Sequence, residues 1–313
     1  GVQTCALPIS AFARLLAELA GERALGRGDP RAEAVLAGLR ALADAELGPA
    51  WRRRHLSEGP VAARPLCAPT PEAVQTTYGE LCALAVDWGP DGTPALHPRP
   101  FARQQAGAYY TPPALVALLL DQAAVGAETR ALIDPACGPG ALLLAAGERM
   151  PADRLYGIDV DPCAVACAQV ALALRVTAAG APPPDLTQRI VCADALLDDA
   201  AWDAVSPPGG FDALVANPPW ERAKLQQVEW LAAHDPGFHG LDAGRRKARL
   251  AELAAARTPL WQAFEAERQR RAGYAQWLRA RYPDVCGGDA NLYAGFAARA
   301  AERIAPDGRA ALL

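Results

Sequence analysis

The sequence predicts an α/β fold built on a doubly wound, mostly parallel sheet, with a helical region before it and a helical insertion within it. Short apolar segments of strand length alternate with segments of helical spacing, which is the pattern of parallel strands joined by crossover helices. Polar or glycine residues directly follow the apolar segments, where open α/β sheets bind ligands. The expected strands are residues 130–137, 155–160, 189–194, 211–216 and 309–313, and the expected helices are 114–124, 141–149, 162–178, 250–280 and a last one ending at 304.

Composition is that of a soluble globular protein of 313 residues, with 51% hydrophobic and 21% charged residues. The formal net charge of −4 gives no global sign of nucleic-acid binding. Residues 221–285 differ from the rest, because they carry 12 basic against 8 acidic side chains. This local excess fits two interpretations, a phosphate-bearing substrate or a solvated helical face.

The 8 cysteines show neither Cys-x-x-Cys pairs nor the spacing of a zinc site, so we expect reduced thiols packed as small apolar residues. We read no signal peptide and no apolar run of membrane-spanning length, and expect a cytoplasmic protein without membrane contact. The chain starts with Gly1, its first ten residues resemble a translated sequencing adapter, and it stops within an expected strand. We therefore interpret it as a fragment.

The pattern of apolar residues divides the chain into two regions. Residues 1–100 are expected to form a helical leading or connector region, in which we find no nuclease-type arrangement of acidic residues. Residues 101–313 are expected to form the main α/β domain, incomplete at its C-terminus and interrupted by a helical insertion at about 221–285. About seventy residues separate Trp220 from the next expected element, too many for a plain connection.

Four groups fall at consecutive strand ends: the turn of Gly138 and Gly140, then Asp159, Asp194 and Asn217. Glycines let a ligand approach the backbone, and the helix start that follows them favours a carboxylate or phosphate. An acidic residue ending the second strand suits the hydroxyls of a ribose. Each group alone is also typical of plain packing, but their occurrence in order predicts a binding site at this edge.

The fourth strand ends in Asn217-Pro218-Pro219-Trp220. Two successive prolines fix the backbone and remove two donors, so the turn is rigid and rich in acceptors. The side-chain oxygen of Asn217 and the carbonyl of Pro218 can then accept from one amino group, while the Trp220 ring offers a face for stacking. Upstream, residues 107–113 precede an apolar helix, for which Thr111 is the expected N-cap.

These residues resemble the N6-adenine DNA methyltransferases of restriction-modification and phage-exclusion systems. Residues 107–112 resemble that family's lip motif, residues 134–140 its Asp-Pro-Ala-Cys-Gly-Ser-Gly turn, and residues 217–220 its catalytic tetrad. The likeness runs from about Phe101 to the end of the chain. The insertion followed by residues 289–293 is most similar to the large fused restriction-modification methylases. Pro139 departs from the family's usual serine and removes a hydroxyl and an amide donor beside the cofactor carboxylate.

The resemblance implies a Rossmann-like, class I S-adenosylmethionine-dependent methyltransferase, whose catalytic domain would be residues 101–313. S-adenosyl-L-methionine would be its cofactor, and no metal would be needed. Thr111 would touch the methionine end, Asp159 the ribose, and Asp194 the adenine amino group. The implied cofactor-binding set is Tyr110, Thr111, Asp134, Ala136, Gly138, Gly140, Asp159, Asp194 and Asn217, and the implied catalytic set is Asn217, Pro218, Pro219 and Trp220.

The implied reaction is methylation of the N6 amino group of an adenine flipped out of double-stranded DNA, by positioning and polarisation of the amine. Specificity or nuclease subunits or domains outside this fragment are the further partners that the resemblance suggests. Two alternatives stay open from the residues. One is a methyltransferase for protein glutamine or ribosomal RNA, and the other is an inactive subunit that binds DNA or partners.

Overall fold

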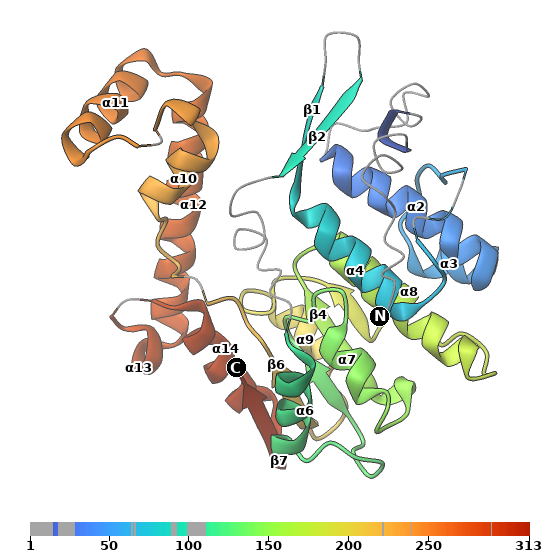
Figure 1. The fold of residues 1–313 in the computed structure, drawn as a ribbon. Helices are drawn as coiled ribbons and strands as arrows, with labels where there is room; N and C mark the ends of the chain where they lie inside the picture. Colours follow the sequence, from blue (N-terminus) through green and yellow to red (C-terminus); the bar gives the residue numbers. More distant parts are fainter. Residues whose placement is uncertain are drawn as a thin grey trace. The chain divides into compact units, whose positions relative to one another are not determined.

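The structure is a computed structural model that describes residues 15–17, 29–63, 65, 67–88, 93–98, 111–220, 222–238, 240–288 and 290–313. Within these ranges the chain divides into two compact units, residues 1–218 with 300–313 and residues 219–299. Figure 1 shows the elements of both units. The predicted division at residue 100 and the predicted insertion at about 221–285 remain predictions about domains.

A parallel sheet of five strands in the order β5-β4-β3-β6-β7 forms the centre of the first unit (Figure 1). The chain runs outward from β3 through β4 to β5 and then returns to β6 on the other side of β3. In open α/β sheets this reversal marks the edge where ligands bind. The strands are β3 (Leu132–Asp134), β4 (Leu155–Asp159), β5 (Ile190–Cys192), β6 (Phe211–Ala216) and β7 (Ile304–Leu312).

Helices cover both faces of this sheet, as the doubly wound prediction requires. Leu132 and Leu155 belong to the hydrophobic core shared with the row of helices on one face. Their neighbours Ile133 and Tyr156 point the other way, because successive side chains of a strand alternate. On that second face Phe211 contacts the rings of Tyr156 and of the fully buried Trp202. The covering helices are α6 (Pro113–Gln122), α7 (Ala141–Ala146), α8 (Pro162–Ala178) and α9 (Asp199–Val205), with the one-turn 3-10 helix η1 (Ala152–Arg154) before β4.

The boundaries of two strands and one helix differ from the sequence prediction. The strand expected at 130–137 is confined to β3, because Pro135 follows Asp134 and the glycine turn begins there. The strand expected from 309 begins at Ile304 and includes Pro306, which is tolerated because β7 is an edge of the described sheet. The helix expected at 141–149 ends at Ala146.

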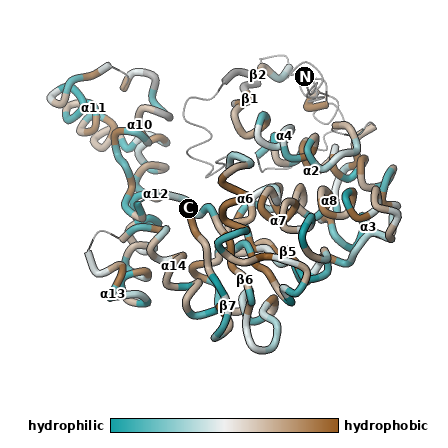
Figure 2. Tube along the Cα trace, turned by 60° about the horizontal axis from the view of Figure 1, so that its bottom comes forward, coloured by the Kyte–Doolittle hydropathy of each residue, from teal (hydrophilic) through white to brown (hydrophobic). Residues whose placement is uncertain are grey.

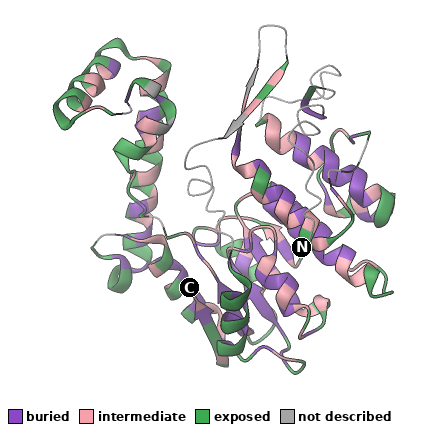
Figure 3. Ribbon diagram, viewed as in Figure 1, coloured by how far each residue is buried: buried purple, intermediate pink, exposed green. Residues whose placement is uncertain are grey.

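The N-terminal helices form a further layer on α8. Residues 163–174 of α8 are all buried, since the sheet covers one side of this helix and α2 and α4 cover the other (Figure 3). The layer comprises α2 (Pro30–Glu46), α3 (Pro49–His55) and α4 (Pro71–Cys82). Residues 84–88 and 94–98, expected within a helical region, instead pair as the antiparallel strands β1 (Leu84–Trp88) and β2 (Pro94–Pro98).

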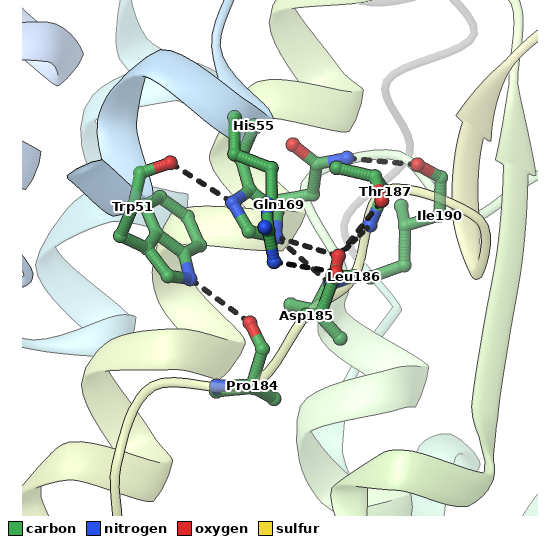
Figure 4. A network of polar contacts seen from close by, with 9 residues as sticks. Trp51, His55, Gln169, Pro184, Asp185, Leu186, Thr187 and Ile190 are labelled. Carbon is green, nitrogen blue, oxygen red and sulfur yellow. Dashed lines mark hydrogen bonds and ion pairs between the residues drawn. The ribbon is translucent and has the colours of Figure 1, made fainter.

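A polar network fastens α3 to the segment that leads into β5 (Figure 4). The Trp51 indole Nε1 donates to the Pro184 carbonyl oxygen at 2.9 Å. The backbone N–H of Leu186 donates to His55 Nε2 at 2.9 Å, so the proton of this imidazole is on Nδ1, 2.9 Å from the Trp51 carbonyl oxygen. The Trp51 and His55 rings stack with centroids 4.1 Å apart. His55 therefore connects α3 to the segment before β5 in two ways: its ring stacks on Trp51, and its Nε2 accepts from Leu186.

The second unit is helical and has its own small core of Leu231, Phe238, Leu253 and Phe264. The helix expected at 250–280 is two helices, because Arg257 adopts a left-handed backbone (φ 47°) and Pro259 starts a new helix capped by Thr258. Figure 2 shows hydrophilic residues along much of α12. The elements are α10 (Gln227–His234), the one-turn 3-10 helix η2 (Pro236–Phe238), α11 (Ala243–Ala256), α12 (Pro259–Arg281), α13 (Pro283–Cys286) and the start of α14 (Leu292–Arg303).

Among the described residues, none of the helices combines the length and the apolar character needed to cross a membrane.

Replacing His55 with Phe should lower the free energy of unfolding by about 1–3 kcal/mol, because ring stacking is kept while the buried Leu186 N–H loses its acceptor. Chemical denaturation measures this change. The neighbouring exposed pair of Arg54 and Asp185 supplies the control, since Arg54→Ala should cost less than about 1 kcal/mol. Equal stability of His55→Phe and the parent protein would contradict the role of the network.

Candidate functional site

Asp134 ends the central strand and is almost fully buried. Its carboxylate accepts a hydrogen bond from the backbone N–H of Ala136 at 3.0 Å. Burial raises the pKa of Asp134 to about 8, and the nearby Asp159 carboxylate also raises it, against the opposing effect of the Ala136 N–H. Burial therefore favours the protonated, neutral form of this acid over the carboxylate.

The turn after β3 places two glycines in left-handed backbone conformations, with φ 51° at Gly138 and 89° at Gly140. A Cβ atom on Gly140 would lie 3.1 Å from the Cβ of Ala168, so glycine is needed for α8 to pack here. A Cβ on Gly138 would meet no atom within 4 Å. Gly138 therefore leaves a space at the carboxyl edge of the sheet that a side chain would fill. A ligand group that binds directly against the backbone requires such a space.

Asp159, at the end of β4, connects two loops through its carboxylate. Oδ2 accepts from the Gly138 N–H at 2.7 Å, and Oδ1 accepts from the Asp161 N–H at 2.9 Å. Burial raises the pKa of Asp159, while these two backbone donors oppose that shift. The glycine turn and the loop after β4 are thus held in a fixed relation by one side chain.

Asp194 lies just beyond β5 and is half-buried. Its Oδ1 accepts from the backbone N–H groups of Leu196 at 2.9 Å and Leu197 at 3.2 Å. The side chain is therefore oriented by its own loop, at the same edge of the sheet as Asp134 and Asp159.

Asn217 follows β6 and contacts Thr111, although 106 residues separate them. The Asn217 amide nitrogen donates to the Thr111 hydroxyl at 3.2 Å, and Thr111 is 6% exposed. An amide that donates through Nδ2 presents Oδ1 as an acceptor. The N-cap of α6 is Pro112, so the prediction that Thr111 caps this helix is wrong, and its hydroxyl faces Asn217 instead. Tyr110 and the other lip residues 107–109 lie outside the described residues.

Pro218 is buried at the end of the first unit, whereas Pro219 and Trp220 begin the second. Trp220 is 53% exposed, and its ring contacts that of Tyr293 with centroids 5.7 Å apart. The backbone segments near Trp220 and Tyr293 are also paired, because the Ala223 N–H donates to the Ala290 carbonyl oxygen at 2.9 Å. Tyr293 was not among the predicted site residues. Its signal in the sequence was an aromatic residue shortly after the predicted insertion.

Val160 is a second residue that the sequence reasoning missed. Its side chain is 70% exposed and directly follows Asp159, between two carboxylates at the end of β4. An isolated exposed apolar side chain is ordinary on a protein surface, but here it lies at the carboxyl edge of the sheet, where open α/β sheets bind ligands. The signal in the sequence was the apolar residue within Asp159-Val160-Asp161.

Residues 99–239 match the sequence profile of the family described as N-6 DNA Methylase. The chain is 29% identical over 136 residues to the Type II methyltransferase M.XamI of Xanthomonas campestris pv. amaranthicola, covering 44% of this chain and 24% of that protein. It is 33% identical over 93 residues to a tRNA1(Val) (adenine(37)-N6)-methyltransferase of Porphyromonas gingivalis, covering 30% of this chain and 33% of that protein. The chain thus spans about a third or less of the length of these relatives.

Two solved structures are similar over part of the chain. One is the methyltransferase subunit of a type I restriction-modification system from Streptococcus thermophilus, with a TM-score of 0.30 and 26% identity over 41% of this chain and 26% of that one. The other is the type IIL restriction-modification enzyme MmeI in complex with DNA, with a TM-score of 0.39 and 14% identity over 77% of this chain and 47% of that one.

The matched residues include the glycine turn, the three aspartates Asp134, Asp159 and Asp194, and the Asn-Pro-Pro-Trp sequence, which are described above. Residues 99–239 of this chain are therefore similar to the N-6 DNA methylase family.

Proposed function

We propose that this chain contains the catalytic domain of a methyltransferase that modifies the N6 amino group of adenine in DNA, within a restriction-modification or phage-defence system. The observation that carries the proposal is Asn217 at the end of β6, held by Thr111 next to the sheet reversal at β3. The match of residues 99–239 to the N-6 DNA methylase family supports it. Double-stranded DNA is the proposed substrate, and specificity or nuclease subunits are proposed partners.

S-adenosyl-L-methionine is the proposed cofactor, and the residues at the carboxyl edge fit it. Gly138 leaves backbone space, and Asp159 provides a carboxylate for the ribose hydroxyls. The exposed Val160 offers an apolar surface to the adenine ring, and Asp194 an acceptor to its amino group. When bound, the cofactor supplies a methyl group that is already activated by the positive charge of its sulfonium. We place Tyr110, Thr111, Asp134 and Ala136 in the same cofactor-binding set.

The chain's contribution to catalysis is to hold and polarise the amine of the target base. Asn217 Oδ1 and the Pro218 carbonyl accept from the two N–H groups, which directs the nitrogen lone pair toward the methyl carbon. Pro219 keeps this turn rigid. Trp220 follows directly in the chain, and its exposed ring offers a stacking surface for a base taken out of the duplex.

The same chemistry on RNA is the second candidate. The similarity to the tRNA (adenine-N6)-methyltransferases of Porphyromonas gingivalis favours it over the protein-glutamine alternative. Both candidates use an acceptor pair for an exocyclic adenine amine, so they differ in the nucleic acid that presents the base. A substrate comparison separates them.

Methyl transfer from labelled S-adenosylmethionine tests the proposal. The full-length gene product would be incubated in parallel with mixed-sequence duplex DNA, transfer RNA and a peptide substrate; the nucleic acids would be digested to nucleosides and the peptide hydrolysed to amino acids. We expect N6-methyladenine in DNA. Label confined to RNA would select the second candidate, and cofactor binding without label in any substrate would contradict the enzymatic proposal.

Asn217→Ala should lower the rate of methyl transfer at least about 100-fold, because the amine loses its side-chain acceptor. Cofactor affinity, measured by calorimetry, should fall much less than the rate, because the other members of the implied cofactor-binding set are kept. The matched control is Asn291→Ala, the same substitution at an asparagine of the second unit that pairs through its backbone with Arg222. An Asn217→Ala protein with the parent rate would overturn the catalytic role.

Asp134→Asn should become more stable relative to the parent as the pH rises from about 4 to 8. The pKa of Asp134 is raised in the folded state, so its contribution to stability is complete below the unfolded pKa and is lost as the pH rises through about 8. Asparagine keeps the acceptor for the Ala136 N–H and does not ionise. Denaturation at several pH values should show the two stabilities diverging by on the order of a few kcal/mol. A difference that is constant with pH would contradict the buried acid.

A further inference from the structure

The helix α4 reaches both loops of the proposed cofactor site, although it belongs to the N-terminal region for which the sequence suggested no chemical role. Gln75 and Tyr78 lie one turn apart on α4, so their side chains project from the same face. Gln75 Nε2 donates to the Pro139 carbonyl oxygen, in the glycine turn, at 3.3 Å. The Tyr78 hydroxyl donates to Asp161 Oδ2, in the loop after β4, at 2.6 Å.

These contacts complete a closed ring of hydrogen bonds. Asp161 donates its backbone N–H to Asp159, and Asp159 also accepts from Gly138. Gly138 adjoins Pro139, which returns the connection to α4 through Gln75. Each loop of the ring is therefore fixed twice, once to the other loop and once to the same face of α4.

The contact of Tyr78 with Asp161 is the stronger of the two connections to α4. Its donor and acceptor are 2.6 Å apart, and Tyr78 is 4% exposed. Hydrogen bonds to a carboxylate are stronger than those between neutral groups. Burial raises the pKa of Tyr78, and the negative charge of Asp161 raises it further, so the hydroxyl stays protonated and donates throughout the physiological range.

Asp161 also caps α8, and this interaction fixes the orientation of its side chain. Its Oδ1 accepts from the Cys163 N–H at 2.8 Å and caps α8, while Oδ2 accepts from Tyr78. Both carboxylate oxygens thus have partners, and the backbone N–H of the same residue orients Asp159. Asp161 therefore connects Tyr78 to Asp159 through two hydrogen bonds.

We propose that Tyr78 is a positioning residue of the cofactor site, which acts through Asp161 to hold the Asp159 carboxylate and the glycine turn in the geometry that binds S-adenosylmethionine. The N-terminal helical layer is then part of the cofactor site and not a connector alone. The identity of the ligand rests on the proposed function. The hydrogen-bond ring itself is independent of it.

The test compares Tyr78→Phe with the parent protein by calorimetric titration of S-adenosylmethionine and S-adenosylhomocysteine. Removing the hydroxyl should raise both dissociation constants about fivefold. Hydrogen exchange of the Gly138 and Asp161 amides should quicken in the ligand-free protein. In methyl transfer, KM for the cofactor should rise while kcat stays near the parent value. Tyr156→Phe is the matched control, because its hydroxyl contacts Arg189 away from these loops.

Asp161→Asn provides a second variant that keeps a helix-capping side chain but has one oxygen instead of two. If the ring acts as a unit, Tyr78→Phe combined with Asp161→Asn should weaken binding no more than the stronger single variant. Parent-like affinity and amide exchange in Tyr78→Phe would overturn the inference. A parent protein that binds neither S-adenosylmethionine nor S-adenosylhomocysteine would instead refute the proposed function. Faster amide exchange in Tyr78→Phe would, even then, show that the hydrogen-bond ring holds the two loops.

Discussion

The Asp159 carboxylate is the interaction on which the candidate site depends. It accepts the Gly138 N–H from one strand-end loop and the Asp161 N–H from the next, so two loops that diverge from neighbouring strands are held at one spacing. Burial raises the pKa of this carboxyl group, and the two backbone donors offset part of that cost. The open space at Gly138, the buried Asp134 and the exposed Val160 surround this point. A ribose that binds to Asp159 would therefore find the two loops at the carboxyl edge of the sheet already held in place.

The helical layers around the sheet hold the loops on either side of the Asp159 carboxylate. α8 is enclosed by the sheet and by α2 and α4, and its start is capped by Asp161, which also accepts from Tyr78. The same N-terminal layer is fastened to the segment before β5 by Trp51 and His55 (Figure 4). Loops at the carboxyl edge therefore rest on a core that extends well beyond the sheet. This gives the N-terminal helices a physical connection to the site.

Much of the fold could be predicted from the sequence, because hydrophobic period and strand-end residues are local signals. They predicted the parallel strands, and they placed Asp159, Asp194 and Asn217 at or directly after the ends of those strands. The contacts that complete the site are not local: Tyr78 and Asp161 are 83 residues apart, and Thr111 and Asn217 are 106 apart. Their pairing depends on packing, which no short window of sequence encodes. The break at Arg257 and the pairing of residues 84–88 with 94–98 were missed for a related reason, since helical propensity there is overridden by backbone and tertiary context.

The most direct test of the central claim is a crystal structure of the protein with S-adenosylhomocysteine. We predict the ribose hydroxyls within hydrogen-bond distance of Asp159, the amino-acid end against the Gly138 turn, and the sulfur directed toward Asn217. The Asp159 bonds to the Gly138 and Asp161 amides should be kept in the complex. A ligand bound elsewhere, or a ribose that makes no contact with Asp159, would contradict the account.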